Sequence, residues 1–223
     1  MSGAVPRIVP LGEAAWTVVL GVTVDRAVHR EVIDLVDRIE ALAIPGVIEV
    51  VPAYATVTVF FDSLAVPGPV LRDQLMALAL QRSSTPADQP TSTQPSSPLF
   101  TIPVTYAGPD LDAVAELTGL SRESVVRMHS EREYIVYMLG FVPGFGYLGD
   151  LHPALVLPRR NSPRTRVPAG SVAIAAAQTA VYPMTTPGGW HLIGSTPLLL
   201  FDPKRNPPAL LTPGARVRFE PAR

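Results

Sequence analysis

A stretch of sixteen residues near the middle of the chain constrains its fold more than any other feature. Residues 83–98 read SSTPADQPTSTQPSSP, and 14 of the 16 are Ser, Thr, Pro or Gln, with Asp88 as the one charge. Such a segment buries too little apolar area to offset the entropy of ordering it. We expect a semi-extended linker with polyproline character that separates residues 1–82 from residues 99–223. A long surface loop inside one domain is the alternative.

The first module, residues 1–82, has the pattern of a small α/β domain. Apolar residues recur every three or four positions between residues 26 and 43, which predicts an amphipathic helix with Asp25 as its N-cap. A second helix is predicted at 69–82. Strand patterns occur at 5–9, 15–22, 47–51 and 55–61. This order predicts a split sheet with two helices on one face.

The second module, residues 99–223, is typical of a closed or nearly closed β-barrel. Two helices are predicted at 111–118 and 122–130, and Ser121 can cap the second. Short extended segments separated by Gly and Pro are predicted at 99–106, 134–141, 171–176, 179–183, 190–193, 197–201 and 215–220. The expected fold class is therefore α+β, a small α/β N-terminal domain followed by a β-barrel domain.

Composition excludes several classes of function. The chain has 18 Lys+Arg against 19 Asp+Glu, so its charge gives no reason to expect nucleic acid or an anionic membrane as partner. Residues 113–127 imitate a helix-turn-helix, but six acids and three bases between residues 110 and 133 would repel phosphates. Without cysteine there is no thiolate zinc site or thiol catalysis. No apolar run approaches 18 residues, and we expect a cytoplasmic protein.

Motif searches give mostly negative results. Residues 144–149, GFGYLG, match the dinucleotide pattern G-x-G-x-x-G, but Pro153 follows too soon for the helix that this motif requires. The chain has no P-loop and no G-x-S-x-G nucleophile elbow. Its four histidines are not at metal-ligand spacing, so we expect no metal.

His129 ends a predicted helix just before a strand. The negative end of the helix dipole favours a cationic imidazole there and raises its pKa towards neutrality. This is suitable for acid–base catalysis, and it is also an ordinary capping arrangement.

The densest signal lies between residues 140 and 202. Five of its six aromatic residues are spread among glycines and prolines before residue 191, and four arginines lie in one loop with no acid nearby in the sequence that could neutralise them all. The aromatic residues are Phe141, Phe145, Tyr147, Tyr182 and Trp190, and the arginines are Arg159, Arg160, Arg164 and Arg166. Aromatic walls with guanidinium groups at the rim indicate a pocket for a small polar or anionic ligand. Gln178 and Thr179 add neutral hydrogen-bonding groups. A barrel whose turns simply need Gly and Pro is the alternative.

Three segments carry a resemblance to a known family. GFVPGFGYLGDL, VPAGSVAIAAAQTAVYP and TPGGWHLIGSTPLLLFD resemble allophanate hydrolase subunit 1, or carboxyltransferase subdomains C and D, over most of the chain. The resemblance is strongest to the branch that contains the B subunit of 5-oxoprolinase and KipI-like proteins. It implies a small α/β domain followed by a cyclophilin-like barrel. It also implies a homologous second cyclophilin-like subunit, designated subunit 2 or the C subunit, with the active site between the two.

The resemblance implies an ATP-dependent hydrolase. In the 5-oxoprolinase version, ATP phosphorylates the lactam carbonyl of 5-oxoproline, and water then opens the ring to glutamate. ATP would be shared with the partner and not bound tightly by this chain alone. The implied catalytic residue is His129. The implied substrate-binding residues are Phe141, Pro143, Gly144, Phe145, Tyr147, Arg159, Arg164, Gln178, Thr179, Tyr182, Gly188, Gly189 and Trp190.

The chain departs from the family pattern at one position that bears on anion binding. Ser195 stands where the family has Arg in L-I-G-R-T-P, so contact with an anionic group would fall to Arg159 or Arg164. Two other functions stay open. One is a carboxyltransferase or allophanate hydrolase-type subunit in a biotin-dependent urea pathway, with biotin carried by another chain because no A-M-K-M motif is present. The other is a non-catalytic inhibitor of a sensor histidine kinase.

Overall fold

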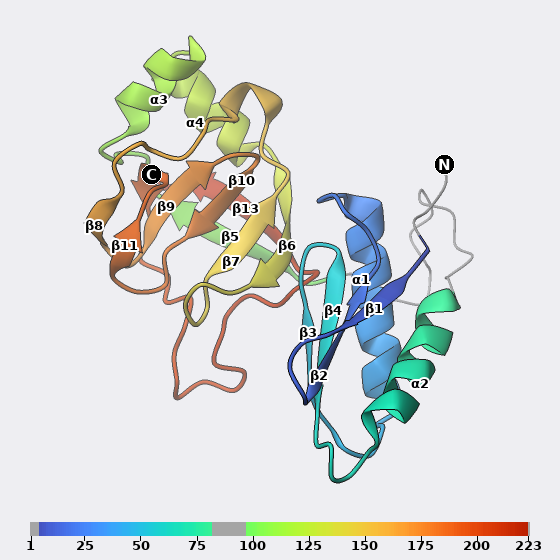
Figure 1. Cartoon of the computed structure of the whole chain (residues 1–223). Coiled ribbons are helices and arrows are strands. Elements are labelled where there is room, and N and C mark those ends of the chain that lie inside the picture. The colour runs from blue at the N-terminus through green and yellow to red at the C-terminus, as the bar shows by residue number, and fades with distance from the viewer. Residues whose placement is uncertain (1–4, 82–96, 223) are drawn as a thin grey trace. The chain divides into compact units, whose positions relative to one another are not determined.

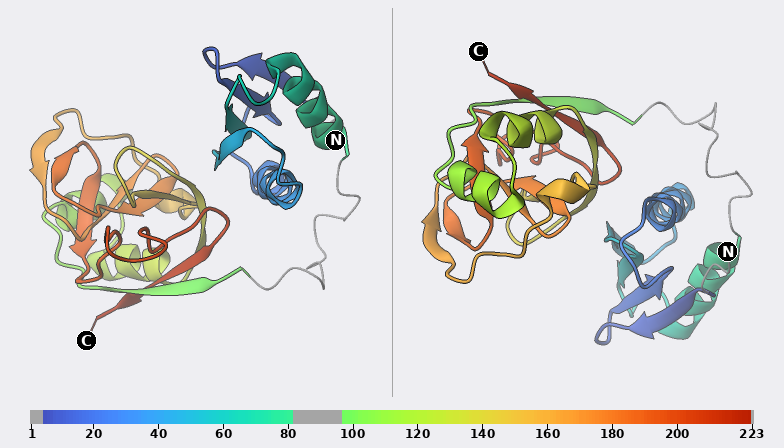
Figure 2. Two further views of the ribbon diagram at one scale, coloured as in Figure 1. Left: turned by 90° about the horizontal axis from the view of Figure 1, so that it is seen from below. Right: turned by 90° about the horizontal axis from the view of Figure 1, so that it is seen from above.

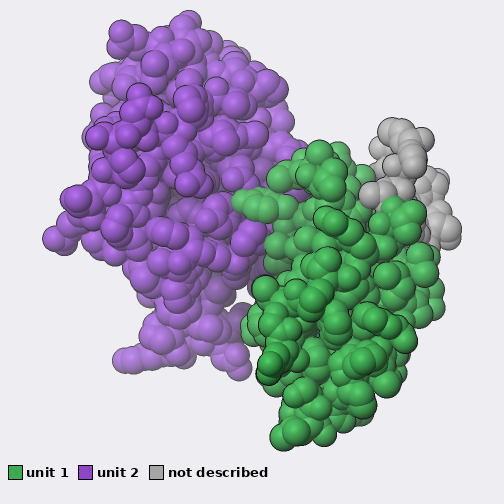
Figure 3. Space-filling view, viewed as in Figure 1, with its two compact units in different colours: residues 1–95 green, residues 96–223 purple. Residues whose placement is uncertain are grey.

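The computed structural model describes residues 5–81 and 97–222. The chain divides into two compact units, residues 1–95 and 96–223 (Figure 3). Each unit has its own hydrophobic core. The linker predicted at 83–98 lies outside the described residues, apart from Ser97 and Pro98. Among the residues that are described, no helix is both long and apolar enough to cross a bilayer.

The first unit is a four-stranded antiparallel sheet with two helices packed against it (Figure 1). The strands have the spatial order β1-β2-β4-β3. The elements are β1 (Arg7–Pro10), β2 (Ala15–Val19), α1 (Arg26–Ala41), β3 (Val47–Pro52), β4 (Thr56–Phe61) and α2 (Gly68–Leu80). Each agrees with a predicted element to within a few residues, and helix termini commonly vary by that amount.

Helix α1 shows why the sequence folds as predicted. The Asp25 carboxylate accepts hydrogen bonds from the backbone N–H groups of Ala27 and Val28, at 2.8 and 3.2 Å. These bonds satisfy donors that a helix N-terminus otherwise leaves unpaired. Leu35 and Ile39, four residues apart, are buried against the sheet. The apolar stripe read from the sequence is therefore the face that forms the core of this unit.

The second unit is a barrel of seven strands in the order β12-β9-β10-β7-β6-β13-β5. A separate pair, β8 and β11, lies beside it (Figure 1). The strands are β5 (Leu99–Val104), β6 (Glu133–Leu139), β7 (Gly146–Gly149), β8 (Arg164–Val167), β9 (Ser171–Ala175), β10 (Gln178–Val181), β11 (Thr186–Gly188), β12 (His191–Ser195) and β13 (Arg216–Pro221). The only parallel pair in the described part of this sheet is β13 with β5 (Figure 2).

The barrel closes where β5 meets β12, the two edge strands of the sheet. Just beyond β5, Thr105 exchanges two backbone hydrogen bonds with Ser195, at 2.9 and 3.0 Å. Two helices, α3 (Leu111–Thr118) and α4 (Arg122–Ser130), cover one end of the barrel (Figure 1). This bridge joins the two edges of the sheet into a nearly closed barrel, and such closure limits edge-to-edge association. The predicted α+β fold class and barrel are confirmed.

Four details differ from the sequence prediction. Residues 146–149 form strand β7, residues 164–167 form strand β8 and residues 186–188 form strand β11, whereas none of these segments was predicted to be a strand. The strand predicted at 197–201 is wrong, because only Phe201 pairs, with Ala209. Glycine and proline are poor strand formers, so β7 and β11 depend on their neighbours rather than on local propensity. Gly146–Gly149 form a strand, so GFGYLG lacks the turn-to-helix context that the dinucleotide motif requires.

Candidate functional site

The five aromatic residues predicted to shape a pocket lie together, and we call them the aromatic cluster. Phe145 is its centre, and its ring centroid lies 4.9 to 5.8 Å from those of the other four. Every one of these contacts is edge-to-face, the arrangement that ring quadrupoles favour. The members are Phe141, Phe145, Tyr147, Tyr182 and Trp190.

The aromatic cluster packs on the outer face of the barrel. On β9, Val172 and Ile174 face the barrel interior, whereas Ala173 and Ala175 face the aromatic cluster. This follows from the alternation of side chains along a strand. Alanine side chains are small, so the rings approach the sheet closely. Gly188 has the same role, because a Cβ at that position would collide with the Tyr182 hydroxyl.

Only part of the aromatic cluster can meet a ligand. Phe145, Tyr182 and Trp190 are buried, Tyr147 is half-buried and Phe141 is 59% exposed. Phe141 also has a φ of 71°, an uncommon conformation for a residue with a side chain. It is presented by a tight turn in which Pro143 is exposed and Gly144 has a φ of 79°. The exposed contact surface is therefore Phe141 and Tyr147, supported by three buried rings.

Of the four arginines in the loop, Arg159 and Arg166 are exposed, and Arg159 lies near the aromatic cluster. Burial raises the pKa of Tyr147 and of Tyr182, and the positive charge of Arg159 opposes that rise at both hydroxyls. Arg159 makes no hydrogen bond or ion pair with the other described residues. Its guanidinium can therefore bind an anionic group beside the rings.

Arg164, which we expected to present a free guanidinium, forms an ion pair with Asp110. Its two terminal nitrogens bind the two carboxylate oxygens of Asp110 at 2.7 and 2.8 Å. Arg160 binds the same carboxylate at 2.6 Å. The sequence prediction missed this acid because it lies 54 residues from Arg164. The anion-binding role predicted for Arg159 or Arg164 is left to Arg159.

Gln178 and Thr179 lie on opposite faces of β10. Gln178 alternates with Ala180 on the face of the aromatic cluster, whereas Thr179 is fully buried in the barrel. The Thr179 hydroxyl lies 2.8 Å from His129 Nε2 and donates to the Ala173 carbonyl at 3.0 Å. Thr179 therefore lies away from the surface where it was expected to bind substrate, whereas Gln178 lies on the same face of β10 as Ala180.

His129 is fully buried inside the barrel. Its Nδ1 lies 2.7 Å from the Tyr106 hydroxyl, and its ring packs 4.5 Å from that of Phe219. Because the Thr179 hydroxyl proton goes to a carbonyl, His129 Nε2–H donates to Thr179 and Nδ1 accepts from Tyr106. In this tautomer each N–H and O–H group of the network formed by Tyr106, His129 and Thr179 has an acceptor.

The predicted pKa of His129 is wrong in direction. Burial away from water lowers the pKa from its ordinary value of 6.5 to about 3. Desolvation outweighs the helix dipole here, because a charged imidazole would lose its hydration and gain no acidic partner. The imidazole is neutral and connects α4 to β10. A signal was present in the sequence, since Val125 and His129 are four residues apart and share the buried face of α4.

The low pKa of His129 predicts a pH-dependent stability. Below about pH 6.5 the unfolded chain binds a proton that the folded chain does not. The free energy of unfolding is therefore highest above pH 6.5 and falls by about 1.4 kcal/mol per pH unit towards pH 3. Urea unfolding between pH 7.5 and pH 4.5 measures this slope. His129→Gln should remove most of it, and an unchanged slope in that variant would contradict the assignment.

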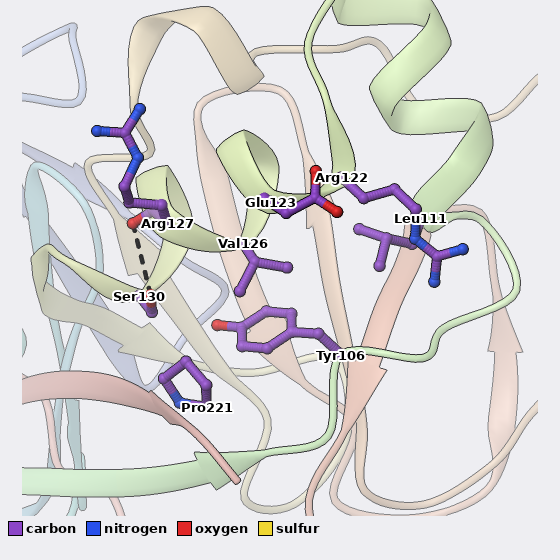
Figure 4. Close-up of a pocket in the computed structure, with 8 residues that line it drawn as sticks. All are labelled: Tyr106, Leu111, Arg122, Glu123, Val126, Arg127, Ser130 and Pro221. Atoms are coloured by element: carbon purple, nitrogen blue, oxygen red, sulfur yellow. Dashed lines mark hydrogen bonds between the residues drawn. The ribbon is translucent and has the colours of Figure 1, made fainter. Parts of the chain in front are cut away.

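A separate pocket of about 430 Å³ lies beside α4 (Figure 4). None of the residues predicted as site residues lines it. Its lining residues are Tyr106, Leu111, Arg122, Glu123, Val126, Arg127, Ser130 and Pro221. Its charges are largely compensated, since Arg122 pairs with Asp112 at 2.9 Å and Glu123 lies between Arg122 and Arg127 along the chain. We therefore place the candidate site at the aromatic cluster.

In the described ranges no group of three or more His, Asp or Glu side chains could hold a metal ion.

Comparison with known proteins gives a match along nearly the whole chain. Residues 6–211 match the family model described as carboxyltransferase domain, subdomain C and D. The B subunit of the 5-oxoprolinase of Bacillus subtilis is 40% identical over 219 residues, which cover 96% of this chain and 91% of that protein. The B subunit of the 5-oxoprolinase of Escherichia coli O157:H7 is 43% identical over 214 residues, covering 95% and 94% of the two chains.

A solved structure agrees in fold. The crystal structure of TTHA0988 has a TM-score of 0.81 and 37% sequence identity, and the match covers 94% of this chain. The match spans 40% of the TTHA0988 chain. The two units described above are therefore found together in a solved protein of greater length.

Proposed function

Because the chain belongs to the family of carboxyltransferase domains, subdomains C and D, we propose that it is the B subunit of a 5-oxoprolinase-type amidohydrolase. The observation that carries this proposal is the similarity to 5-oxoprolinase B subunits over more than nine-tenths of both chains. The proposed overall reaction converts 5-oxoproline, ATP and water into glutamate, ADP and phosphate.

The chemistry of 5-oxoproline suits the candidate site. The substrate is a small five-membered lactam that carries one carboxylate. Its ring can lie against Phe141 and Tyr147, and its carboxylate can accept two parallel hydrogen bonds from Arg159. Gln178, on the same face, offers an amide that can both donate and accept. In this proposal the present chain binds and orients the substrate.

We propose that this chain by itself does not bind ATP tightly. Helix N-termini and Gly-rich turns are the usual cradles for phosphate, but residues 144–149 form a turn and strand β7 with no long helix after them. In this proposal ATP is shared with the partner subunit, and no residue of this chain is given a step in the chemistry of ATP. The proposed partner is a homologous second cyclophilin-like subunit, and the chain is inactive without it.

This assignment predicts that the isolated chain does not bind ATP tightly. Titration calorimetry of the purified chain with ATP and magnesium should give no heat of binding at micromolar concentrations, because no long helix follows the Gly-rich residues 144–149. The complex with the partner should bind. Micromolar affinity of the chain alone would move the nucleotide site onto this subunit.

The proposed function is tested by co-expressing the chain with its partner subunit. The purified complex should form glutamate from 5-oxoproline and release one ADP for each glutamate, whereas the chain alone should do neither. ATP hydrolysis that ignores 5-oxoproline would contradict the proposal. Carboxylation of urea from carboxybiotin would instead support the carboxyltransferase alternative, and inhibition of a histidine kinase by the chain alone would support the inhibitor.

A further inference from the structure

Asp110 holds the most densely bonded carboxylate in the described part of the chain. It is 3% exposed and makes four short contacts. Arg160 contributes one at 2.6 Å, Arg164 contributes two at 2.7 and 2.8 Å, and the backbone N–H of Leu192 donates at 2.7 Å. Burial raises the pKa of Asp110, but these hydrogen bonds and positive charges outweigh it and keep the pKa below its usual range.

The position of Asp110 is unusual for a residue that precedes a helix. An Asp at the N-cap of α3 would ordinarily accept hydrogen bonds from the first turn, yet its side chain makes none there. It turns instead towards β8 and β12. The backbone approaches β12 closely, because Asp110 N–H donates to the Leu192 carbonyl at 3.0 Å and a Cβ on Gly108 would run into that carbonyl.

Both segments that Asp110 joins carry candidate site residues. Arg160 follows Arg159, and Leu192 lies two residues after Trp190. Two further bonds tie the same segments together. The Arg160 N–H donates to the Gly189 carbonyl at 2.8 Å, and His191 Nε2–H donates to the Pro158 carbonyl at 2.9 Å. Asp110 is thus the charged centre of a network between the arginine loop and the turn that carries Trp190.

We propose that Asp110 is a positioning residue for the substrate site. It fixes the arginine loop against the Trp190 turn and thereby holds Arg159 beside the aromatic cluster. It also neutralises part of the charge of Arg160 and Arg164, whereas it makes no contact with Arg159, whose guanidinium stays available to a carboxylate. Asp110 does not touch the substrate. This inference rests on the proposed function for its ligand and on the geometry of the described residues for the network.

The test compares Asp110→Asn with Asp112→Asn in the complex with the partner subunit. Asp112 lies two residues along, on the first turn of α3, and pairs with Arg122 on the surface, where the two side chains are 76% and 51% exposed. Asp110→Asn keeps the shape of the side chain but loses its charge. We expect it to raise KM for 5-oxoproline about tenfold or more, because small displacements of binding groups are costly. The value of kcat should change much less, and Asp112→Asn should change neither.

A second readout does not depend on activity. The chain has two tryptophans, so a Trp16→Phe background leaves Trp190 as the single fluorophore. Acrylamide quenching of Trp190 well below the melting temperature should increase in Asp110→Asn and stay unchanged in Asp112→Asn. If Asp110→Asn does not fold, Arg160→Met is used, since it leaves the Arg164 pair in place, and it should raise KM and quenching to a smaller extent.

These measurements test the positioning role of Asp110 separately from the proposed 5-oxoprolinase function. Folded variants that lose thermal stability but keep wild-type KM and wild-type quenching would overturn the positioning role. A wild-type complex without 5-oxoproline turnover would overturn the proposed function, and quenching would still decide whether Asp110 positions the Trp190 turn.

Discussion

Replacing His129 by alanine is expected to lower the free energy of unfolding of the barrel unit by about 3–5 kcal/mol. The imidazole is fully buried and packs on Phe219, so its removal leaves a cavity. It also leaves the Tyr106 hydroxyl without its acceptor inside the protein and Thr179 without a donor. The cavity and the unpaired hydroxyl groups lie at the same place, and losses of several kcal/mol in the free energy of unfolding are typical when a buried polar network is broken.

Chemical denaturation and thermal melting measure this effect, with two controls. His129→Gln should recover part of the stability, because its amide can accept from Tyr106 and donate to Thr179. His152→Ala should cost only about 1 kcal/mol, since His152 caps the short helical turn Pro153–Leu155 through one bond to Ala154. An unchanged melting temperature together with a rate loss of about 10²–10⁴-fold in the complex would instead show that His129 acts as an acid–base catalyst.

Replacing Trp190 by alanine is expected to cost about 3–5 kcal/mol of stability and also to weaken substrate binding. Trp190 is 5% exposed and contacts Phe145 and Tyr147 edge to face. Without it Tyr147, one of the two rings that can meet a ligand, loses a supporting neighbour. The loss of order at the exposed surface should therefore raise KM for 5-oxoproline.

Trp190→Phe is the matched variant for this measurement. It keeps an aromatic ring in the cluster and should lose less stability and less affinity than Trp190→Ala. Both variants are measured in the complex at a temperature at which they are folded. A Trp190→Ala complex that melts early but binds 5-oxoproline with wild-type KM would limit the aromatic cluster to a structural role.

The features that depend on local sequence were predictable. The helix of residues 26–41 follows from its apolar stripe and its Asp25 cap, and both are observed. The grouping of the five aromatic residues was predictable too, because they recur within one segment of Gly/Pro-rich sequence. Strand alternation could also have placed Thr179 and Gln178 on opposite faces.

The features that depend on contacts far apart in the sequence were not predictable. Asp110 meets Arg164 across 54 residues, and charge counting along the chain cannot reveal such a pair. His129 meets Thr179 across 50 residues, so the dipole of its own helix was a poor guide to its pKa. Strand β8 pairs with β11, which follows it by about 20 residues. In each case tertiary burial overrides the local rule.

We propose that the face of this chain formed by Arg159 and the aromatic cluster binds the substrate of a 5-oxoprolinase. The most direct measurement is KM for 5-oxoproline in the complex with Arg159→Gln, beside Arg218→Gln as a control. Arg218 is an exposed arginine of the same barrel that pairs with Glu133 at 2.6 Å. We predict that Arg159→Gln raises KM about tenfold or more, as expected when a charge-assisted contact is lost, and that Arg218→Gln leaves it unchanged. Equal KM values in both variants and the wild type would contradict the claim.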